Sequence, residues 1–372
     1  MSIPRLAVRD AHGAWDWEKG IYDPTAAMTG KKHYVITKVH TDEGIVGLGE
    51  GDPVDPSFYG ETQETIVHVI RRFFAPMLLG KNPLNTESIM APLEHGFPGS
   101  ACAKCALDIA LFDIAGKAFG VPVYTLLGGI YREKIPVALE VHLNSPEEMA
   151  RVALEHVEKR KVGVLKVKVG VDLQEDIERV RAVREAVGWR TKIRVDGNCG
   201  YTASDAIRFA KGAEKYDLEL IEQPVGRWDI EGLARIRSAI DIPLEVDESV
   251  WSIADALNVI RHKAADIINI KITRVGGLTN ARKIAAIAEA AHLECLVGTE
   301  GEFGVGTAAK IHLALATKNM NLASEFTEYY TTLDNIWAKP IAMQDGFLGA
   351  IHEPGLGVEL DEEKMRIYTR AL

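Results

Sequence analysis

Five short apolar segments follow one another in the middle of the chain, and each ends in a charged residue. The segments end at Lys168, Asp196, Glu222, Asp247 and Lys271, which lie 28, 26, 25 and 24 residues apart by subtraction of their sequence numbers. That spacing fits one strand, one helix and two short loops, because parallel neighbours need a crossover of about a dozen residues. Between the segments, apolar residues recur every three or four positions, as in an amphipathic helix. The pattern predicts a repeating strand–helix unit.

The first of these segments carries two lysines. Lys166 and Lys168 point to the same side of the predicted strand, because strand side chains alternate between the two faces. Two ammonium groups on one face of an apolar strand repel each other and are costly to desolvate. A solvated edge strand is one explanation. The other is a site that needs a lysine of lowered pKa as a base near neutral pH, and the acids that follow favour it.

The three acids of the series lie at the ends of consecutive predicted strands. In a parallel α/β barrel, the C-terminal ends of the strands meet at one face, where active sites are found. A single acid in such a place is more often a helix N-cap. Asp196, Glu222 and Asp247 are hard to explain as three independent caps, and three carboxylates suit a hard divalent cation, Mg²⁺ before Mn²⁺. We therefore predict a metal site with lysines on either side.

These motifs resemble those of the enolase superfamily and, within it, the muconate-lactonising-enzyme subgroup of the mandelate racemase/muconate-lactonising-enzyme group. The matching positions are Lys166 and Lys168 for the Lys-x-Lys motif, Asp196, Glu222 and Asp247 for the metal ligands, and Lys271 for the opposing lysine. Gly44–Glu50 resembles the hairpin of the capping domain, and residues 106–117 resemble its signature helix. Mandelate racemase itself places a histidine at the end of the seventh strand. Residues 293–300 contain no histidine, which excludes that closer subgroup.

The resemblance implies an α/β fold, a (β/α)7β TIM-like barrel with an N-terminal α+β capping domain. We expect the capping domain at residues 1–128, with a lid loop at about 12–28, the barrel at 129–326, and a C-terminal segment at 327–372 that returns to the capping domain. The residues themselves predict a hairpin that pairs 34–39 with 45–49, and helices at 61–79 and 101–119.

The resemblance also implies a half-reaction. The carboxylate of the substrate binds the metal, a lysine removes the proton alpha to it, and the metal stabilises the resulting enediolate. Lys168 is the expected base, and Lys166 is expected to hold its pKa down. Lys271 is expected to be a second base, an acid or an electrostatic partner. This predicts a Mg²⁺-dependent isomerase, either a cycloisomerase or a racemase/epimerase. The alternatives are a syn-dehydratase of a β-hydroxy acid and a metal-stabilised barrel that only binds its ligand.

Further side chains are expected to contact the substrate. They are Asn198, Glu300, Glu302, Trp15, Trp17 and Tyr22. Glu302 matches the family's seventh-strand Met-x-Glu segment, whereas Glu300 stands where relatives often have methionine. An acid near aromatic rings suits a cation, and this favours a substrate that carries an amino or ammonium group, such as an amino-acid derivative, over a dianionic muconate. Pairing of Glu300 with a nearby Lys or Arg is the alternative.

The composition limits the classes of molecule that the protein is expected to bind. A net charge of −10 over 372 residues argues against nucleic-acid binding. The four cysteines show no disulfide or zinc pattern. No apolar stretch is long enough to span a membrane and no signal peptide is recognised, so we expect a cytoplasmic protein. We also expect a homo-oligomer that acts on a small-molecule carboxylate.

Overall fold

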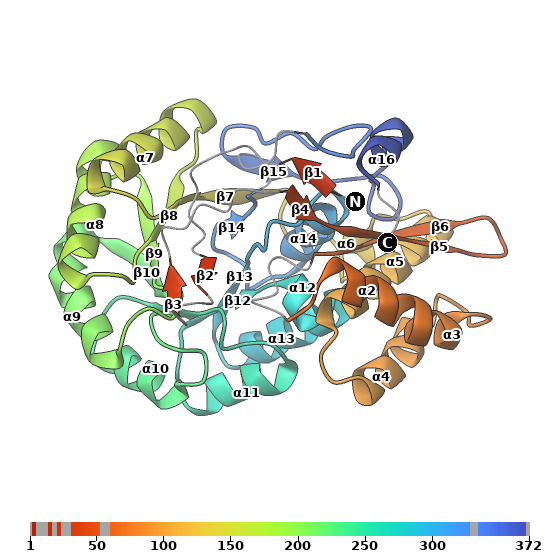
Figure 1. Ribbon diagram of the computed structural model, residues 1–372, viewed down its shortest axis with the longest axis horizontal. Helices are drawn as coiled ribbons and strands as arrows, with labels where there is room; N and C mark the ends of the chain where they lie inside the picture. Colours follow the sequence, from red (N-terminus) through yellow and green to blue (C-terminus); the bar gives the residue numbers. More distant parts are fainter. Residues whose placement is uncertain are drawn as a thin grey trace.

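The structure is a computed structural model that describes residues 2–4, 14–16, 21–23, 31–52, 60–327 and 334–369, with side chains from residue 34 onward. Within these residues, parallel strands form a nearly closed barrel (Figure 1), and the predicted fold class is confirmed. The barrel strands are β7 (Lys134–Val141), β8 (Val164–Lys168), β9 (Lys192–Asp196), β10 (Leu218–Glu222), β11 (Leu244–Val246), β12 (Ile267–Ile270), β13 (Glu294–Val297) and β14 (Ser324–Glu325).

The strands pair in chain order from β7 to β13, and β14 pairs with β7. The backbone N–H of Val297 in β13 donates to Ser324 Oγ in β14 at 3.3 Å, so these two strands lie next to each other where the ring closes. In this ring of eight described strands, β8 and β12 lie four places apart in either direction. Their carboxyl ends are therefore on opposite walls of the barrel.

Helices surround the barrel and return the chain between its strands (Figure 1). They are α7 (Pro146–Arg160), α8 (Leu173–Val187), α9 (Ala203–Ala213), α10 (Ile230–Arg237), α11 (Ile253–Arg261), α13 (Leu278–Ala290) and α14 (Val305–Ala316), with a short α12 (Ile272–Val275) after β12. Several of these helices begin with a polar N-cap residue. Asp172, Thr202 and Ser252 each accept a hydrogen bond from a backbone N–H of the first helical turn. The helices thus begin at defined points just beyond the strand ends.

The N-terminal unit contains the predicted hairpin, β5 (Val35–His40) with β6 (Val46–Gly51), and the predicted long helix α5 (Ala101–Phe119). The segment predicted as one helix at 61–79 is interrupted. It forms α2 (Gln63–Val69), a π-helical stretch at Ile70–Phe74, and α3 (Ala75–Leu78). An additional helix, α4 (Thr86–Gly96), encloses a proline that weakens its sequence signal. Two pairs of short strands, β1 (Ser2–Pro4) with β4 (Lys31–His33) and β2 (Ala14–Asp16) with β3 (Ile21–Asp23), complete this unit.

The hairpin lies directly against α5 and against the barrel. A Cβ atom on Gly49 would lie 1.7 Å from the carbonyl oxygen of Ala106, so only glycine allows this approach. At the end of β6, the buried Glu50 accepts hydrogen bonds from the backbone N–H groups of Phe303 at 2.5 Å and Gly306 at 3.0 Å. Burial raises the pKa of Glu50, and these two donors oppose that shift. The capping unit is therefore tied to the loop that precedes α14 and to the first turn of that helix.

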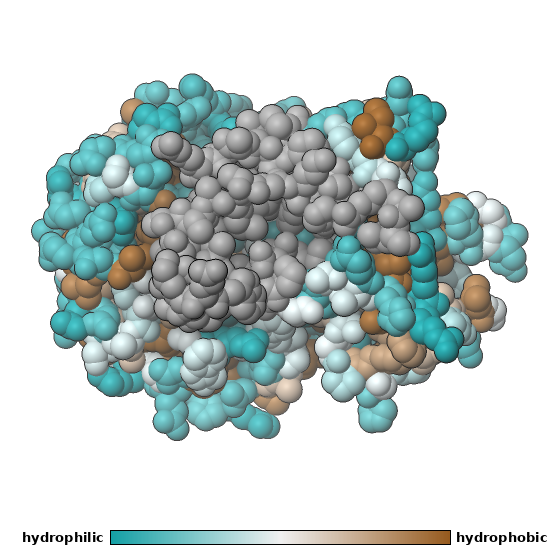
Figure 2. All heavy atoms as spheres, in the orientation of Figure 1, coloured by the Kyte–Doolittle hydropathy of each residue, from teal (hydrophilic) through white to brown (hydrophobic). Residues whose placement is uncertain are grey.

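The segment after β14 contacts both units. β15 (Phe347–Gly349) pairs antiparallel with the start of β7, and α16 (Glu362–Tyr368) reaches β5 through Lys38 and Glu362, 2.7 Å apart. Ile336 and Trp337 pack in one buried cluster with Tyr34 and Phe303. On the face shown in Figure 2, the surface over the outer barrel helices is mostly hydrophilic. Among the described residues, no helix is long and apolar enough to cross a bilayer.

Candidate active site

The charged residues predicted from the repeat lie together at the C-terminal face of the barrel. Lys168, Asp196 and Glu222 are the last residues of β8, β9 and β10, and Asp247 and Lys271 directly follow β11 and β12. Four of these side chains are buried: Asp196, Glu222, Asp247 and Lys271. Parallel strands running in register produce this convergence, because their ends meet at one rim.

Lys166 lies one layer deeper in the barrel and is almost fully buried. Its Nζ is 2.8 Å from Glu325 Oε2, 3.1 Å from Glu140 Oε1 and 3.2 Å from Glu222 Oε2. Burial disfavours the ammonium form, but the surrounding carboxylates outweigh burial and raise the pKa of Lys166. Lys166 is therefore a fixed positive charge within the site.

Lys168 donates hydrogen bonds to Asp196 Oδ2 at 2.7 Å and to Asn198 Oδ1 at 2.9 Å. Burial lowers its pKa, as does the charge of Lys166, yet Asp196 and Glu140 outweigh both and the pKa of Lys168 is raised. The expectation of a lowered pKa is thus wrong for the arrangement in this structure. The acids that surround the lysine decide the sign of the shift, although Lys166 acts in the expected direction.

Lys271 lies on the opposite wall. Its Nζ is 2.6 Å from Asp247 Oδ2 and 3.2 Å from Glu300 Oε1. Arg274 of α12 pairs with the other oxygen of Asp247. Burial raises the pKa of Asp247, but these two cations outweigh burial and lower it. The lysine and the arginine together hold the Asp247 carboxylate in its charged form.

A group of buried glutamates could hold a divalent cation. Among the described residues, Glu222, Glu245 and Glu325 each offer one carboxylate oxygen within 4.8 Å of the others. Glu222 also belongs to the ligand set predicted from the sequence, whereas Asp196 and Asp247 lie at the strand ends, each against a lysine. Two overlapping sets of acids therefore share Glu222.

The chemistry of these acids fits a metal ion. Within the described part of the chain, Glu245 Oε2 and Glu325 Oε1 accept no hydrogen bond, and Glu222 Oε2 and Glu325 Oε2 face the ammonium group of Lys166. Burial raises the pKa of Glu245 to about 8, and the nearby charge of Glu325 adds to the shift. Burial and Asp196 likewise raise the pKa of Glu222. Buried carboxylates that repel one another are costly as anions, and a divalent cation would offset that cost.

Sequence reasoning missed several residues that position the acids. Asn269 in β12 donates from Nδ2 to Glu245 Oε1 at 2.9 Å and to Glu222 Oε1 at 3.2 Å. Gln223 accepts at Oε1 from the backbone N–H groups of Asp247 at 3.0 Å and Ser249 at 3.1 Å. The sequence gives one sign of the role of Asn269, because it is the only polar residue in the apolar run 267–270.

The predicted substrate-contacting residues fall into different places. Asn198 lies beside the candidate base, and its Nδ2 donates to Glu248 Oε1 at 3.0 Å. Glu300 lies next to Lys271, so the pairing alternative is the arrangement observed. Glu302 is buried and accepts from Lys310 Nζ at 2.9 Å and from Thr299 Oγ1 at 3.0 Å, which fixes the loop after β13.

The aromatic residues expected on the lid are only partly covered by the structure. Trp15 in β2 is the backbone partner of Tyr22 in β3. Their side chains, and the whole of Trp17, lie outside the described residues.

Comparison with known proteins identifies two matching family models. The model "Mandelate racemase / muconate lactonizing enzyme, N-terminal domain" matches residues 23–128, and the model "Enolase C-terminal domain-like" matches residues 148–364. The chain is 37% identical to the N-succinyl-L-Arg/Lys racemase of Bacillus cereus over 90% of both chains. It is also 37% identical to the L-Ala-D/L-Glu epimerase of Clostridium acetobutylicum over 87% of this chain and 90% of that protein.

Among solved structures, the chain is similar to the muconate lactonizing enzyme of Pseudomonas fluorescens complexed with muconolactone. The TM-score is 0.91 at 30% sequence identity, and the match covers 99% of this chain and 96% of that chain. The names of these relatives describe isomerases of two kinds, one that inverts a carbon centre and one that closes a lactone ring.

Proposed function

Because the chain belongs to the mandelate racemase/muconate lactonizing enzyme family of the enolase superfamily, we propose that it is a racemase or epimerase that inverts the α-carbon of an N-acylated amino acid. The observation that carries this proposal is the placement of Lys168 and Lys271 at the ends of β8 and β12, on opposite walls of the barrel. Inversion requires one group to remove a proton from one face of the carbon and another group to return a proton to the opposite face.

The residues around the two lysines suit these two proton-transfer roles. Lys168 is within hydrogen-bonding distance of Asp196 and Asn198, and Lys271 of Asp247, so each amine is aimed by polar groups on its own wall. Lys166, whose Nζ lies 3.2 Å from Glu222 Oε2 and 3.5 Å from Asp196 Oδ2, contributes a fixed charge near the carboxylate of the substrate. Fixed cations of this kind stabilise the negative charge that develops when the α-proton leaves.

We assign a Mg²⁺ ion to Asp196, Glu222 and Asp247. When bound, such an ion withdraws charge from the substrate carboxylate and makes the neighbouring C–H bond more acidic. Glu245 lies two residues before Asp247 on the same strand face and accepts a hydrogen bond from Asn269 Nδ2. We therefore place it in the layer of side chains below the metal and not among the metal ligands. The deeper Glu325 pairs with Lys166 at 2.8 Å.

Calorimetry on two variants distinguishes the two sets of acids. Asp196→Asn should lower Mg²⁺ affinity by at least about tenfold, since an amide is a much weaker ligand than a carboxylate. Glu325→Gln should leave Mg²⁺ affinity within a few-fold. The reverse result would assign the ion to the deeper group of Glu222, Glu245 and Glu325.

The proposed substrate class rests on the relatives and on charge. The substrates in the names of the two 37%-identical relatives are amino acids whose nitrogen is acylated, by succinate in one and by alanine in the other. An acylated nitrogen carries no positive charge next to the α-carbon. Free amino acids would bring an ammonium group between Lys168, Lys271 and the metal, and like charges in a buried site repel strongly.

Proton exchange in D₂O tests the proposal directly. With Mg²⁺ present, N-succinyl amino acids and dipeptides should lose their α-proton signal in NMR spectra and acquire the opposite configuration at the same carbon. Exchange without inversion would rule out the two-base role. No exchange on any N-acylated acid would contradict the substrate class.

A muconate cycloisomerase is the second candidate. It is favoured by the structural match to an enzyme complexed with muconolactone. Cycloisomerisation needs one proton donor, so only one of the two lysines would then be required. Consumption of cis,cis-muconate, followed by its ultraviolet absorbance, together with no exchange on N-acylated acids, would favour this candidate.

A further inference from the structure

The side-chain amide of Asn198 joins the candidate base Lys168 to an acid at another strand end. Lys168 Nζ donates to Asn198 Oδ1 at 2.9 Å, and Asn198 Nδ2 donates to Glu248 Oε1 at 3.0 Å. The three residues lie at or just after the ends of β8, β9 and β11, so these hydrogen bonds span the rim over β10. The amide therefore relates the position of the lysine to that of a residue three strands away.

The two partners determine which end of the amide faces the lysine. An ammonium group can only donate hydrogen bonds, and a carboxylate can only accept them. The amide oxygen of Asn198 therefore faces Lys168, and the amide nitrogen faces Glu248. A flipped amide would lose both hydrogen bonds and would set donor against donor and acceptor against acceptor. Held at both ends, the amide keeps one orientation, whereas an amide held only by the lysine would be free to rotate.

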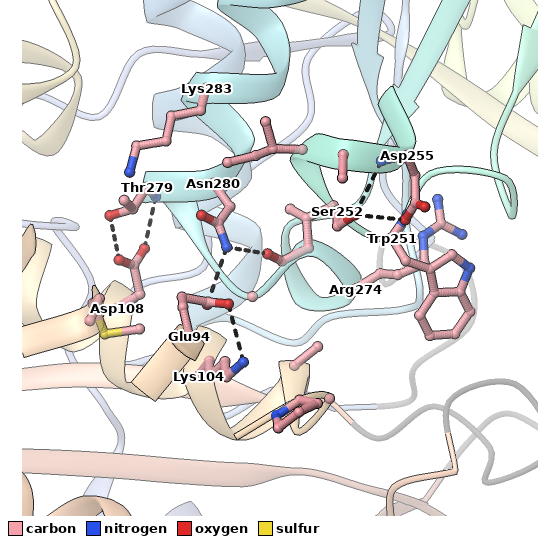
Figure 3. Close-up of a pocket in the computed structure, with 18 of the residues that line it drawn as sticks. Glu94, Lys104, Asp108, Trp251, Ser252, Asp255, Arg274, Thr279, Asn280 and Lys283 are labelled. Carbon is pink, nitrogen blue, oxygen red and sulfur yellow. Dashed lines mark hydrogen bonds and ion pairs between the residues drawn. The ribbon is translucent and has the colours of Figure 1, made fainter. Parts of the chain in front are cut away.

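The backbones of Asn198 and Glu248 are held by one buried residue, Gln223. The carbonyl oxygen of Gln223 accepts from the N–H of the residue after Asn198 at 2.8 Å. Its side-chain Oε1 accepts from the N–H groups of the residues before and after Glu248, at 3.0 and 3.1 Å. Trp251, labelled in Figure 3, donates from its indole Nε1 to the Glu248 carbonyl at 2.7 Å. The two loops are thus fixed relative to each other, and they support the amide from below.

The contacts of the Glu248 side chain give it little part in holding the fold together. Among the described residues, its Oε1 accepts from Asn198 alone, and its buried Oε2 accepts no hydrogen bond. Each carboxylate oxygen can accept two hydrogen bonds, so a carboxylate that is largely removed from water with one is destabilising. A buried polar group that is poorly satisfied calls for an explanation outside stability. Its one partner, Asn198, supplies that explanation.

We propose that Glu248 is a positioning residue that aims the Lys168 amine at the substrate through Asn198. This role rests on the proposed function, in which Lys168 removes the α-proton. A neutral lysine amine has two N–H groups and one lone pair. When the N–H groups donate to Asp196 Oδ2 and Asn198 Oδ1, at 2.7 and 2.9 Å, the lone pair points away from both. An amine held in this orientation accepts the α-proton more readily than one that rotates freely.

Deuterium uptake by the two enantiomers, measured separately at saturating Mg²⁺, tests this role. Glu248→Met should slow uptake with retained configuration at least about tenfold for the enantiomer that depends on Lys168, and less than about threefold for the other. The loss should appear in kcat and not in KM, because the carboxylate acts on the base and not on the substrate. Glu248→Gln should restore most of the rate, since the glutamine oxygen can still accept from Asn198 Nδ2.

The matched control is Glu231→Met. Glu231 is an exposed acid in the first turn of α10, so this variant removes the same charge from the surface and should change neither rate.

The amide itself provides a readout that needs no turnover. In spectra of protein labelled with ¹⁵N-asparagine, the Asn198 side-chain signal is the one that disappears in Asn198→Asp. One of its two protons should be protected from exchange with solvent by the hydrogen bond to Glu248. That protection should be lost in Glu248→Met and kept in Glu248→Gln and in Glu231→Met.

The contrary results have separate meanings. Protection that is equal in Glu248→Met and the parent protein would show that Glu248 does not hold the amide, and would overturn the proposal. Equal slowing of both enantiomers, or a Glu248→Gln variant as slow as Glu248→Met, would show that Glu248 acts through its charge and would also overturn it. A parent protein that exchanges no N-acylated acid would contradict the proposed function and, with it, the aiming of the base. Lost protection in Glu248→Met would then still show that Glu248 fixes the amide.

Discussion

Gly298 lies directly against the side chain of Asn269, and a methyl group on the glycine would be 1.9 Å from Asn269 Oδ1. Gly298→Ala should therefore displace Asn269 from Glu222 and Glu245. We expect a loss of about 1–3 kcal/mol in the free energy of unfolding and weaker metal binding. Urea unfolding measures the change in stability, and calorimetry measures the change in metal binding.

The control is Gly163→Ala, where the added methyl meets nothing within 4 Å, and it should change neither quantity. An unchanged Gly298→Ala variant would mean that Asn269 does not support the acids.

Removing either candidate base should affect the two enantiomers of the substrate unequally. Lys168→Ala should abolish proton exchange mainly from one enantiomer, and Lys271→Ala mainly from the other, since each amine faces one side of the α-carbon. The loss should be at least about 10²-fold in each case. Deuterium incorporation into separate D and L substrates measures it. Full turnover by Lys271→Ala would leave Lys168 as the only base and favour cycloisomerisation.

Arg194 is fully buried, and its Nε lies 2.5 Å from Glu219 Oε2. Removing the carboxylate in Glu219→Ala leaves a buried cation without its partner and should cost about 3 kcal/mol in unfolding free energy. Lys192 pairs with the other oxygen of Glu219 but is largely exposed. Lys192→Ala should thus cost less than about 1 kcal/mol. Equal losses in both variants, measured by chemical denaturation, would contradict this ranking.

His312 should make the fold sensitive to acid. It is buried in α14, where Nδ1 accepts from the Tyr124 N–H at 3.2 Å and Nε2 donates to the Leu356 carbonyl at 3.2 Å. Burial lowers the pKa of His312 to about 4, and the bond to Leu356 opposes the shift only in part. The unfolded chain takes up this proton near pH 6.5 and the folded chain only near pH 4. The stability from the neutral ring is therefore complete above about pH 6.5 and is lost as the pH falls toward 4.

The full contribution of His312 to that loss should be about 3 kcal/mol. His312→Gln should remove this part of the pH dependence, because glutamine can accept and donate without titrating. Unfolding curves between pH 4 and 7 measure it. The exposed His262→Gln is the control and should keep the slope of the parent protein. A slope that is unchanged in His312→Gln would show that other groups account for the acid sensitivity.

The barrel and its charged rim could be predicted because the strands repeat at a near-constant interval and each ends in a charge. The remaining polar groups of the interior could not. β14 is only two residues long, too short for a periodic pattern to reveal Glu325. The paired glutamate Glu140 is the neighbour of Lys166 in the strand register, a relationship that appears only once β7 and β8 are aligned.

Local features of the barrel interior account for the other differences between the predicted and the observed side-chain environments. Arg194 and Glu245 lie two residues before Asp196 and Asp247, so strand alternation predicts that both point into the barrel one layer below the predicted metal site. The ladder between β9 and β10 shifts register between Leu218 and Leu220, and this irregularity brings Glu219 to Arg194. The sign of the pKa shift at Lys168 depends on the number of carboxylates that surround it, and strand spacing does not contain that information.

The hydrogen bonds that join Glu50 to the start of α14 also bear on how the chain is made. Its two donors, Phe303 and Gly306, follow Glu50 by 253 and 256 residues. During synthesis on the ribosome, the hairpin emerges first but has no partner for this carboxylate until nearly the entire barrel has left the exit tunnel. Contacts between residues so far apart slow folding. The hairpin can pack against α5 as soon as residues 101–119 have emerged, but the Glu50 carboxylate at its end lacks both donors for most of translation. This end of the hairpin is therefore the part of the N-terminal unit at which incomplete chains are most open to chaperone binding and aggregation.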